Sequence, residues 1–145
     1  MPRGELTTAV EYDVPVHVAF AYLADPRNRP EWQSSLRAVE VLDGGPPRVG
    51  MRWRDLTSAR IVPDMMITEM ENDVLWAETG AWKAIEADLT LGFSPRDGGC
   101  TVSAAFGVRA RGLLRPVGWA ATGAGRLAVR GDLRNAARIL ASRSN

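Results

Sequence analysis

Acidic side chains occur in the middle of several stretches that otherwise have the composition of strands. They are Asp55, Glu69, Glu78, Glu86 and Asp88. Acids are disfavoured inside strands, so each needs a reason to be there. A carboxylate that faces a cavity is desolvated, which raises its pKa and suits it to act as a general base. We take Asp88 and Glu86 as candidate catalytic residues, although carboxylates on the solvated outer face of a sheet would give the same pattern.

An arginine beside such an acid would complete the site. A guanidinium can orient a phenol or a carbonyl and can stabilise an enolate oxygen. The candidates for this partner are Arg126 and Arg109, and we place Arg126 among both the catalytic and the ligand-binding candidates. Tyr12, Tyr22 and Thr122 are weaker candidates for relaying a proton.

The position of Arg126 depends on residues 112–142. This segment is rich in Ala, Leu, Arg and Val, which predicts a long helix, and three glycines weaken or bend its first half. With Leu133 at the centre of the buried face, the residues within about 60° of it are Val129, Ala136, Ala137 and Leu140. Towards the N-terminus the same stripe passes through Arg126, Thr122, Trp119 and Gly118.

A helix that turns an arginine and a threonine inward beside glycines is expected to form one wall of a ligand chamber, because an unpaired buried charge is very costly. The alternative is a rotation of the helix at Gly123 and Gly125. Arg126 would then be an ordinary surface residue, and the buried stripe would be Leu114, Val117, Ala121, Ala124 and Ala128.

The rest of the chain predicts seven strands and two short helices. The strands are expected at 6–14, 36–42, 50–57, 59–71, 74–79, 81–93 and 100–110, and the helices at 16–24 and 28–35. Pro63 implies an edge position or a bulge, and Gly80 is expected to separate two strands. The connections between the later strands are too short for parallel pairing, so we expect an antiparallel sheet that curls around the long helix.

Large apolar side chains suggest what such a chamber would hold. Flat aromatic walls suit an aromatic ligand, and methionine side chains adapt to irregular shapes. The candidate ligand-binding residues are Trp53, Asp55, Met65, Ile67, Trp76, Trp82, Phe106, Trp119, Thr122 and Arg126. The alternative is that the tryptophans and methionines are ordinary core residues, as we expect for Trp32.

Composition limits the other possibilities. A chain of 145 residues with 46% hydrophobic residues fits one domain, residues 1–145. The net charge of +1 argues against a dedicated nucleic-acid binder. Cys100 and His17 are the only residues of their types, which excludes an intrachain disulfide and a multi-histidine metal site. We expect a cytoplasmic protein without a cofactor or membrane insertion, either a monomer or a homodimer.

The order of these elements, the segment 15–26 (PVHVAFAYLADP) and the following Pro30-Glu31-Trp32 resemble the START-like, or SRPBCC, helix-grip superfamily of the polyketide cyclase/dehydrase type. The segment 132–140 resembles the closing helix of that superfamily. The resemblance implies an α+β fold in which a seven-stranded curved antiparallel sheet wraps around a long C-terminal helix, with two short helices after the first strand. It also implies a cavity for a hydrophobic small molecule, but it carries over no catalytic residue.

Three functions therefore remain open. The first is binding of an aromatic or polyketide-like molecule, with cyclase or dehydratase chemistry in which a desolvated carboxylate enolises a poly-β-ketone. The second is a non-catalytic carrier, sequestering self-resistance protein or sensor. The third is a structural module whose cavity is filled by its own side chains.

Overall fold

A computed structural model describes residue 6 and residues 8–144, apart from the side chains of residues 119 and 120. Seven antiparallel strands form a single sheet in the order β1-β7-β6-β5-β4-β3-β2 within this part of the chain. The strands are β1 (Thr8–Tyr12), β2 (Leu36–Val41), β3 (Arg52–Thr57), β4 (Asp64–Glu71), β5 (Leu75–Trp82), β6 (Ile85–Arg96) and β7 (Gly99–Ala110).

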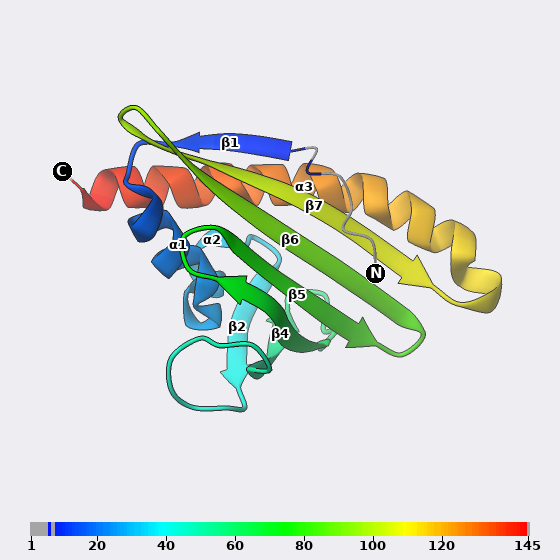
Figure 1. Ribbon diagram of the computed structural model, residues 1–145. Helices are drawn as coiled ribbons and strands as arrows, with labels where there is room; N and C mark the ends of the chain where they lie inside the picture. The colour runs from blue at the N-terminus through cyan, green and yellow to red at the C-terminus, as the bar shows by residue number, and fades with distance from the viewer. Residues whose placement is uncertain (1–5, 7, 145) are drawn as a thin grey trace.

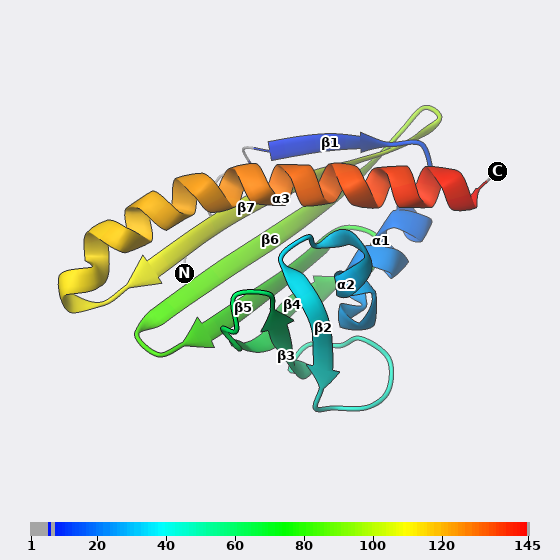
Figure 2. The same ribbon diagram turned by 180° about the vertical axis from the view of Figure 1, so that it is seen from behind.

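The helices lie between β1 and β2 and after β7. They are α1 (Val16–Ala24), the 3₁₀ turn η1 (Pro26–Asn28), α2 (Arg29–Trp32), the 3₁₀ turn η2 (Gly112–Leu114) and α3 (Arg115–Arg143). Figure 1 shows α3 running alongside β1 and β7. Figure 2, seen from behind, shows α1 and α2 beside the C-terminal half of α3. The predicted helix-grip fold is confirmed.

The C-terminal half of α3 packs through the predicted stripe. Leu133, Ala136 and Leu140 are buried in the core, and Val129 and Ala137 pack against it. The hydroxyl of Tyr12 on β1 donates a hydrogen bond of 2.6 Å to the carbonyl of Leu133. This bond fixes the helix along the edge of the sheet.

The N-terminal half of α3 follows the first sequence interpretation at Gly118 and Thr122, which face the sheet, but not at Arg126. Its line of contact with β7 runs through Gly118, Thr122 and Gly125: the backbone N–H of Val108 donates to Thr122 Oγ1 at 2.9 Å, and Gly125 lies against the ring of Phe106. Arg126, one residue beyond this line, is exposed. The predicted inward orientation of Arg126 is therefore wrong.

The alternative stripe is wrong as well, although it places Arg126 correctly. Four of its members are exposed, namely Leu114, Val117, Ala124 and Ala128. A helical wheel with a fixed step of about 100° per residue cannot decide whether Gly125 or the neighbouring Arg126 faces the sheet. The close contact between Gly125 and Phe106 decides which residue faces the sheet.

Two predicted strand boundaries also differ. Gly80 does not separate strands, because β5 continues to Trp82 and the chain turns at Lys83, whose φ is 54°. A Cβ at Gly80 would lie 2.6 Å from Met65 Sδ, so this glycine admits the Met65 side chain. Pro63 lies just before β4, whereas the bulge lies between Ile67 and Glu69.

Two neighbouring glycines of α3 provide a test of this contact. We expect Gly125→Ala to lower the free energy of unfolding by about 1–3 kcal/mol, because its Cβ would overlap the Phe106 ring. Gly123 has no atom within 4 Å of such a Cβ. Gly123→Ala is the matched control and should raise that free energy by about 0.5–1 kcal/mol. Urea unfolding followed by circular dichroism measures both, and equal effects would contradict the contact.

Candidate ligand-binding and acid–base site

A cavity of about 360 Å³ lies between the concave face of the sheet and α3. Most of its wall is apolar and comes from the central strands and from small residues of the helix. The apolar lining residues are Ile61, Pro63, Met65, Gly80, Trp82, Ile85, Ala87, Leu89, Phe106, Val108, Gly125, Ala128 and Val129. Gly125 and Val129 of α3 both pack against neighbouring residues and line the cavity, so the cavity adjoins the packing stripe of the helix.

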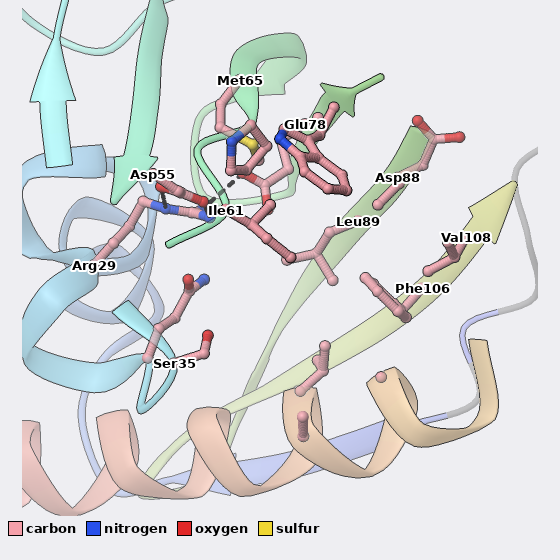
Figure 3. A pocket seen from close by; sticks show the side chains of 18 of the residues that line it. Arg29, Ser35, Asp55, Ile61, Met65, Glu78, Asp88, Leu89, Phe106 and Val108 are labelled. Carbon is pink, nitrogen blue, oxygen red and sulfur yellow. Dashed lines mark hydrogen bonds and ion pairs between the residues drawn. The ribbon is translucent and has the colours of Figure 1, made fainter. Parts of the chain in front are cut away.

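One end of the cavity is closed by three buried charges, as Figure 3 shows. Arg29 Nε and Nη2 donate to the two oxygens of Asp55 at 3.2 and 2.8 Å, and Arg29 Nη1 donates to Glu78 Oε2 at 2.8 Å. The three residues are between 2% and 6% exposed and all line the cavity. A bidentate arginine held by two carboxylates has a fixed orientation.

Three separate elements bring these charges together. Arg29 begins α2, which follows η1 and the cap that Asp25 makes to the backbone N–H of Arg27. Asp55 lies on β3 and Glu78 on β5. Trp53, two residues before Asp55 and therefore on the same face of β3, donates from Nε1 to Asp55 Oδ1 at 2.9 Å. The guanidinium carbon of Arg29 also lies 5.2 Å from the centroid of the Trp53 ring.

The electrostatics of this end favour a proton on Glu78. Burial raises the pKa of Glu78 to about 7; Arg29 opposes the rise and Asp55 adds to it. Two carboxylates share one guanidinium, so the fully ionised group carries an excess negative charge. A proton on Glu78 removes that excess. Glu78 can therefore exchange a proton near neutral pH, which is the property required of a general acid or base.

The predicted binding residues fall into three groups. Asp55, Met65, Trp82 and Phe106 line the cavity. Trp53, Ile67 and Trp76 are fully buried in the hydrophobic core and do not line the cavity. Thr122 bonds to β7, Arg126 is exposed, and the side chain of Trp119 lies outside the described part of the structure.

The two predicted catalytic acids lie near Arg109. Asp88 lines the cavity on the side opposite Arg29 (Figure 3) and makes an ion pair of 2.7 Å with Arg109. Glu86 pairs with Arg109 at 3.2 Å and with Arg111 at 3.6 Å, and it does not line the cavity. Both acids are about 40% exposed. Water therefore solvates them, unlike Glu78.

Arg29 is the residue that sequence reasoning missed, and Glu78 was not distinguished from the other strand acids. A signal for Arg29 was present, because it lies three residues before Trp32, which was expected to be buried, and residues at this spacing share a helix face. An arginine on a buried face needs an acidic partner. The identity of that partner could not be read from spacing, since Asp55 and Glu78 are 26 and 49 residues away.

A family model described as polyketide cyclase / dehydrase and lipid transport matches residues 3–145. The chain belongs to this family. Its fold is correspondingly a hydrophobic ligand-binding fold of the START-like type. No curated protein matches the sequence. None of the helices in the described residues is long and apolar enough to cross a membrane.

Solved structures share the fold at low sequence identity. A START superfamily protein from Mycobacterium smegmatis aligns with a TM-score of 0.73 and 11% identity over 92% of this chain and 96% of its own. Ara h 8.0201 aligns with a TM-score of 0.71 and 12% identity over 92% of this chain and 95% of its own. DynU16, from the dynemicin biosynthetic locus, aligns with a TM-score of 0.67 and 13% identity over 92% of this chain and 45% of its own.

The raised pKa of Glu78 predicts how stability depends on pH. The folded protein holds this proton more tightly than the unfolded chain does. The contribution of Glu78 to stability should therefore be largest below pH 4.5, the ordinary pKa of its carboxyl, and should fall by about 3 kcal/mol as the pH rises to about 7. Glu78→Gln should remove this fall.

Urea unfolding at pH values across that window measures it. Glu71→Gln, at an exposed position of β4, is the control and should keep the wild-type dependence. The same pH slope in the wild type and in Glu78→Gln would contradict the assignment.

Proposed function

We propose that this protein binds a hydrophobic, aromatic or polyketide-like small molecule in the cavity, with a polar end of the ligand directed at Arg29, Asp55 and Glu78. The observation that supports this proposal is an apolar cavity closed at one end by buried, mutually paired charges. Its volume of about 360 Å³ is in the range of small-molecule pockets. Apolar walls contribute affinity, and a few placed polar groups fix the orientation of the ligand.

We further propose acid–base catalysis by Glu78. Glu78 Oε2 is held by Arg29, and no described residue donates to its other oxygen, Oε1. In a poly-β-ketone, the Glu78 carboxylate would take a proton from the carbon between two carbonyls. The resulting enolate attacks another carbonyl carbon and forms a carbon–carbon bond and an alkoxide. Glu78 then returns the proton to the alkoxide oxygen, so the cyclisation needs no cofactor.

A carrier is the second candidate function. The description of the matching family includes lipid transport, and most residues that line the cavity are apolar. In this case the buried charges only orient the ligand. The two functions share the binding site and differ in whether Glu78 transfers a proton to and from the ligand.

A cavity-filling substitution tests binding. We expect Ala128→Phe to weaken binding of the neutral aromatic probe N-phenyl-1-naphthylamine by about tenfold or more, because Ala128 lines the cavity; a loss of about 1.4 kcal/mol corresponds to that factor. Ala124→Phe, one turn earlier on an exposed position of α3, should bind as the wild type does. Fluorescence titration measures the affinity of each variant for the probe. Equal affinities of Ala128→Phe and the wild type would show that the probe binds outside the cavity.

Hydrogen–deuterium exchange tests catalysis. We expect the wild type to accelerate exchange of the methyl protons of 2-acetylnaphthalene in D₂O, followed by NMR, because Glu78 acts as the base. Glu78→Gln should reduce the acceleration by about 100-fold or more, the usual contribution of a general base. Glu71→Gln is the control. Binding without Glu78-dependent exchange would support the carrier.

A further inference from the structure

The charges around the cavity are unbalanced. Its lining contains four carboxylates and one guanidinium. They are Asp55, Glu78, Asp88, Asp132 and Arg29. Asp88 has Arg109 as a partner outside the lining, and Asp132 accepts hydrogen bonds from the backbone N–H and hydroxyl of Ser34. The charged groups that border this mainly apolar space are therefore for the most part hydrogen-bond acceptors with negative charge.

Arg29 does not offset this charge for an incoming anion. Its guanidinium already makes a bidentate pair with Asp55 and a third bond to Glu78, all at 2.8–3.2 Å. An anionic head group at this end would lie beside two carboxylates in a desolvated space, where repulsion between like charges is strongly felt. A buried arginine often binds the carboxylate or phosphate of a ligand. Here the carboxylates of Asp55 and Glu78 already occupy that position on Arg29.

The open oxygen of Glu78 indicates the opposite preference. Glu78 is 6% exposed, it lines the cavity, and its Oε1 receives no hydrogen bond from a described residue. Glu78 Oε1 is not among the fully buried unpaired atoms of the described residues, so it is accessible from the cavity. A hydroxyl group on the ligand can therefore donate a hydrogen bond to it in place of water. Gln33 and Ser35 lie in the same lining and can bond to further oxygens of the ligand.

We propose that the ligand of this cavity carries a neutral hydroxyl, as a phenol, enol or alcohol, that donates to Glu78, and that the cavity excludes ligands with a carboxylate, sulfate or phosphate head group. This inference rests on the proposed binding function and narrows its ligand class. The proposed ligand class therefore leaves out free fatty acids and phospholipids, and it includes hydroxylated aromatic and polyketide-like molecules.

A pair of ligands of similar shape tests the proposal. At about pH 8, 2-naphthol is mainly neutral and 2-naphthoate is ionised. Isothermal titration calorimetry with the wild type should show 2-naphthol binding about 100-fold or more tighter than 2-naphthoate, and about tenfold tighter than naphthalene, which has no head group. Equal or tighter binding of 2-naphthoate would overturn the proposal, as would equal affinity for 2-naphthol and naphthalene.

Variants assign the selectivity to this end of the cavity. Glu78→Gln removes a negative charge and adds N–H donors, so the preference for 2-naphthol over 2-naphthoate should fall by about tenfold or more. Asp132→Asn, on α3, should shift it in the same direction if Glu78→Gln does not fold. An unchanged preference in folded variants of both positions would overturn the assignment to these acids.

The pH dependence adds a second readout. The titratable groups that face the cavity are Arg29 from α2, Asp55 from β3, Glu78 from β5, Asp88 from β6 and Asp132 from α3. Burial raises the pKa of Glu78 and of Asp132. Exclusion of 2-naphthoate should therefore weaken from about pH 8 to about pH 6, where the ligand itself remains ionised. Exclusion that is unchanged over this range would contradict a role of Glu78.

Failure of the underlying function looks different from failure of this inference. If neither naphthalene, nor 2-naphthol, nor N-phenyl-1-naphthylamine binds, the cavity is not a ligand site and the proposed function fails. If the wild type binds both naphthalene and 2-naphthoate, and Ala128→Phe weakens the binding of both, the cavity is a ligand site and the proposed binding function is supported. The proposed preference for a neutral hydroxyl group is then wrong.

Discussion

Burial of Arg29 against Asp55 and Glu78 is the constraint that organises this end of the molecule. Moving charges out of water costs several kcal/mol for each ion, and only close pairing with good geometry offsets that cost. The pairing therefore requires α2, β3 and β5 to meet in one arrangement. These three residues are the buried charged side chains of the described chain. A wall of packed aliphatic residues would close this end without the cost of burying charge, and the function proposed above gives the charges a role in orienting a ligand.

The remainder of the fold keeps a space open in front of these charges. The curved sheet supplies one wall, and α3 supplies the other through Gly125, Ala128 and Val129. Small side chains on the helix leave room that leucines would fill. Tyr12 and Thr122 hold the helix to the sheet by hydrogen bonds to Leu133 and Val108, so the helix cannot simply close the gap. Gly125 and Val129 take part both in packing and in lining the cavity, so one face of the helix serves both purposes.

Sequence reasoning was most successful where local signals dominate. The bounds of α1 (Val16–Ala24) follow from Pro15 at its start and Pro26 after its end, and the buried stripe around Leu133 follows from helical periodicity. It failed where the answer depends on contacts between distant elements. The partners of Arg29 lie on two strands, Asp55 on β3 and Glu78 on β5. The rotation of α3 that exposes Arg126 is fixed by the contact of Gly125 with Phe106. Asp55 was among the predicted binding residues and lines the cavity, but its pairing with Arg29 depends on a contact between distant elements.

The central claim is that the buried charges of this cavity receive the polar end of an apolar ligand. A crystal structure of the protein in complex with 2-naphthol tests it most directly. The account predicts the ring system between Leu89 and Phe106 and the hydroxyl within hydrogen-bond distance of Glu78 Oε1. A ligand outside the cavity, or one whose oxygen points away from Glu78 towards the Asp88 side, would contradict it.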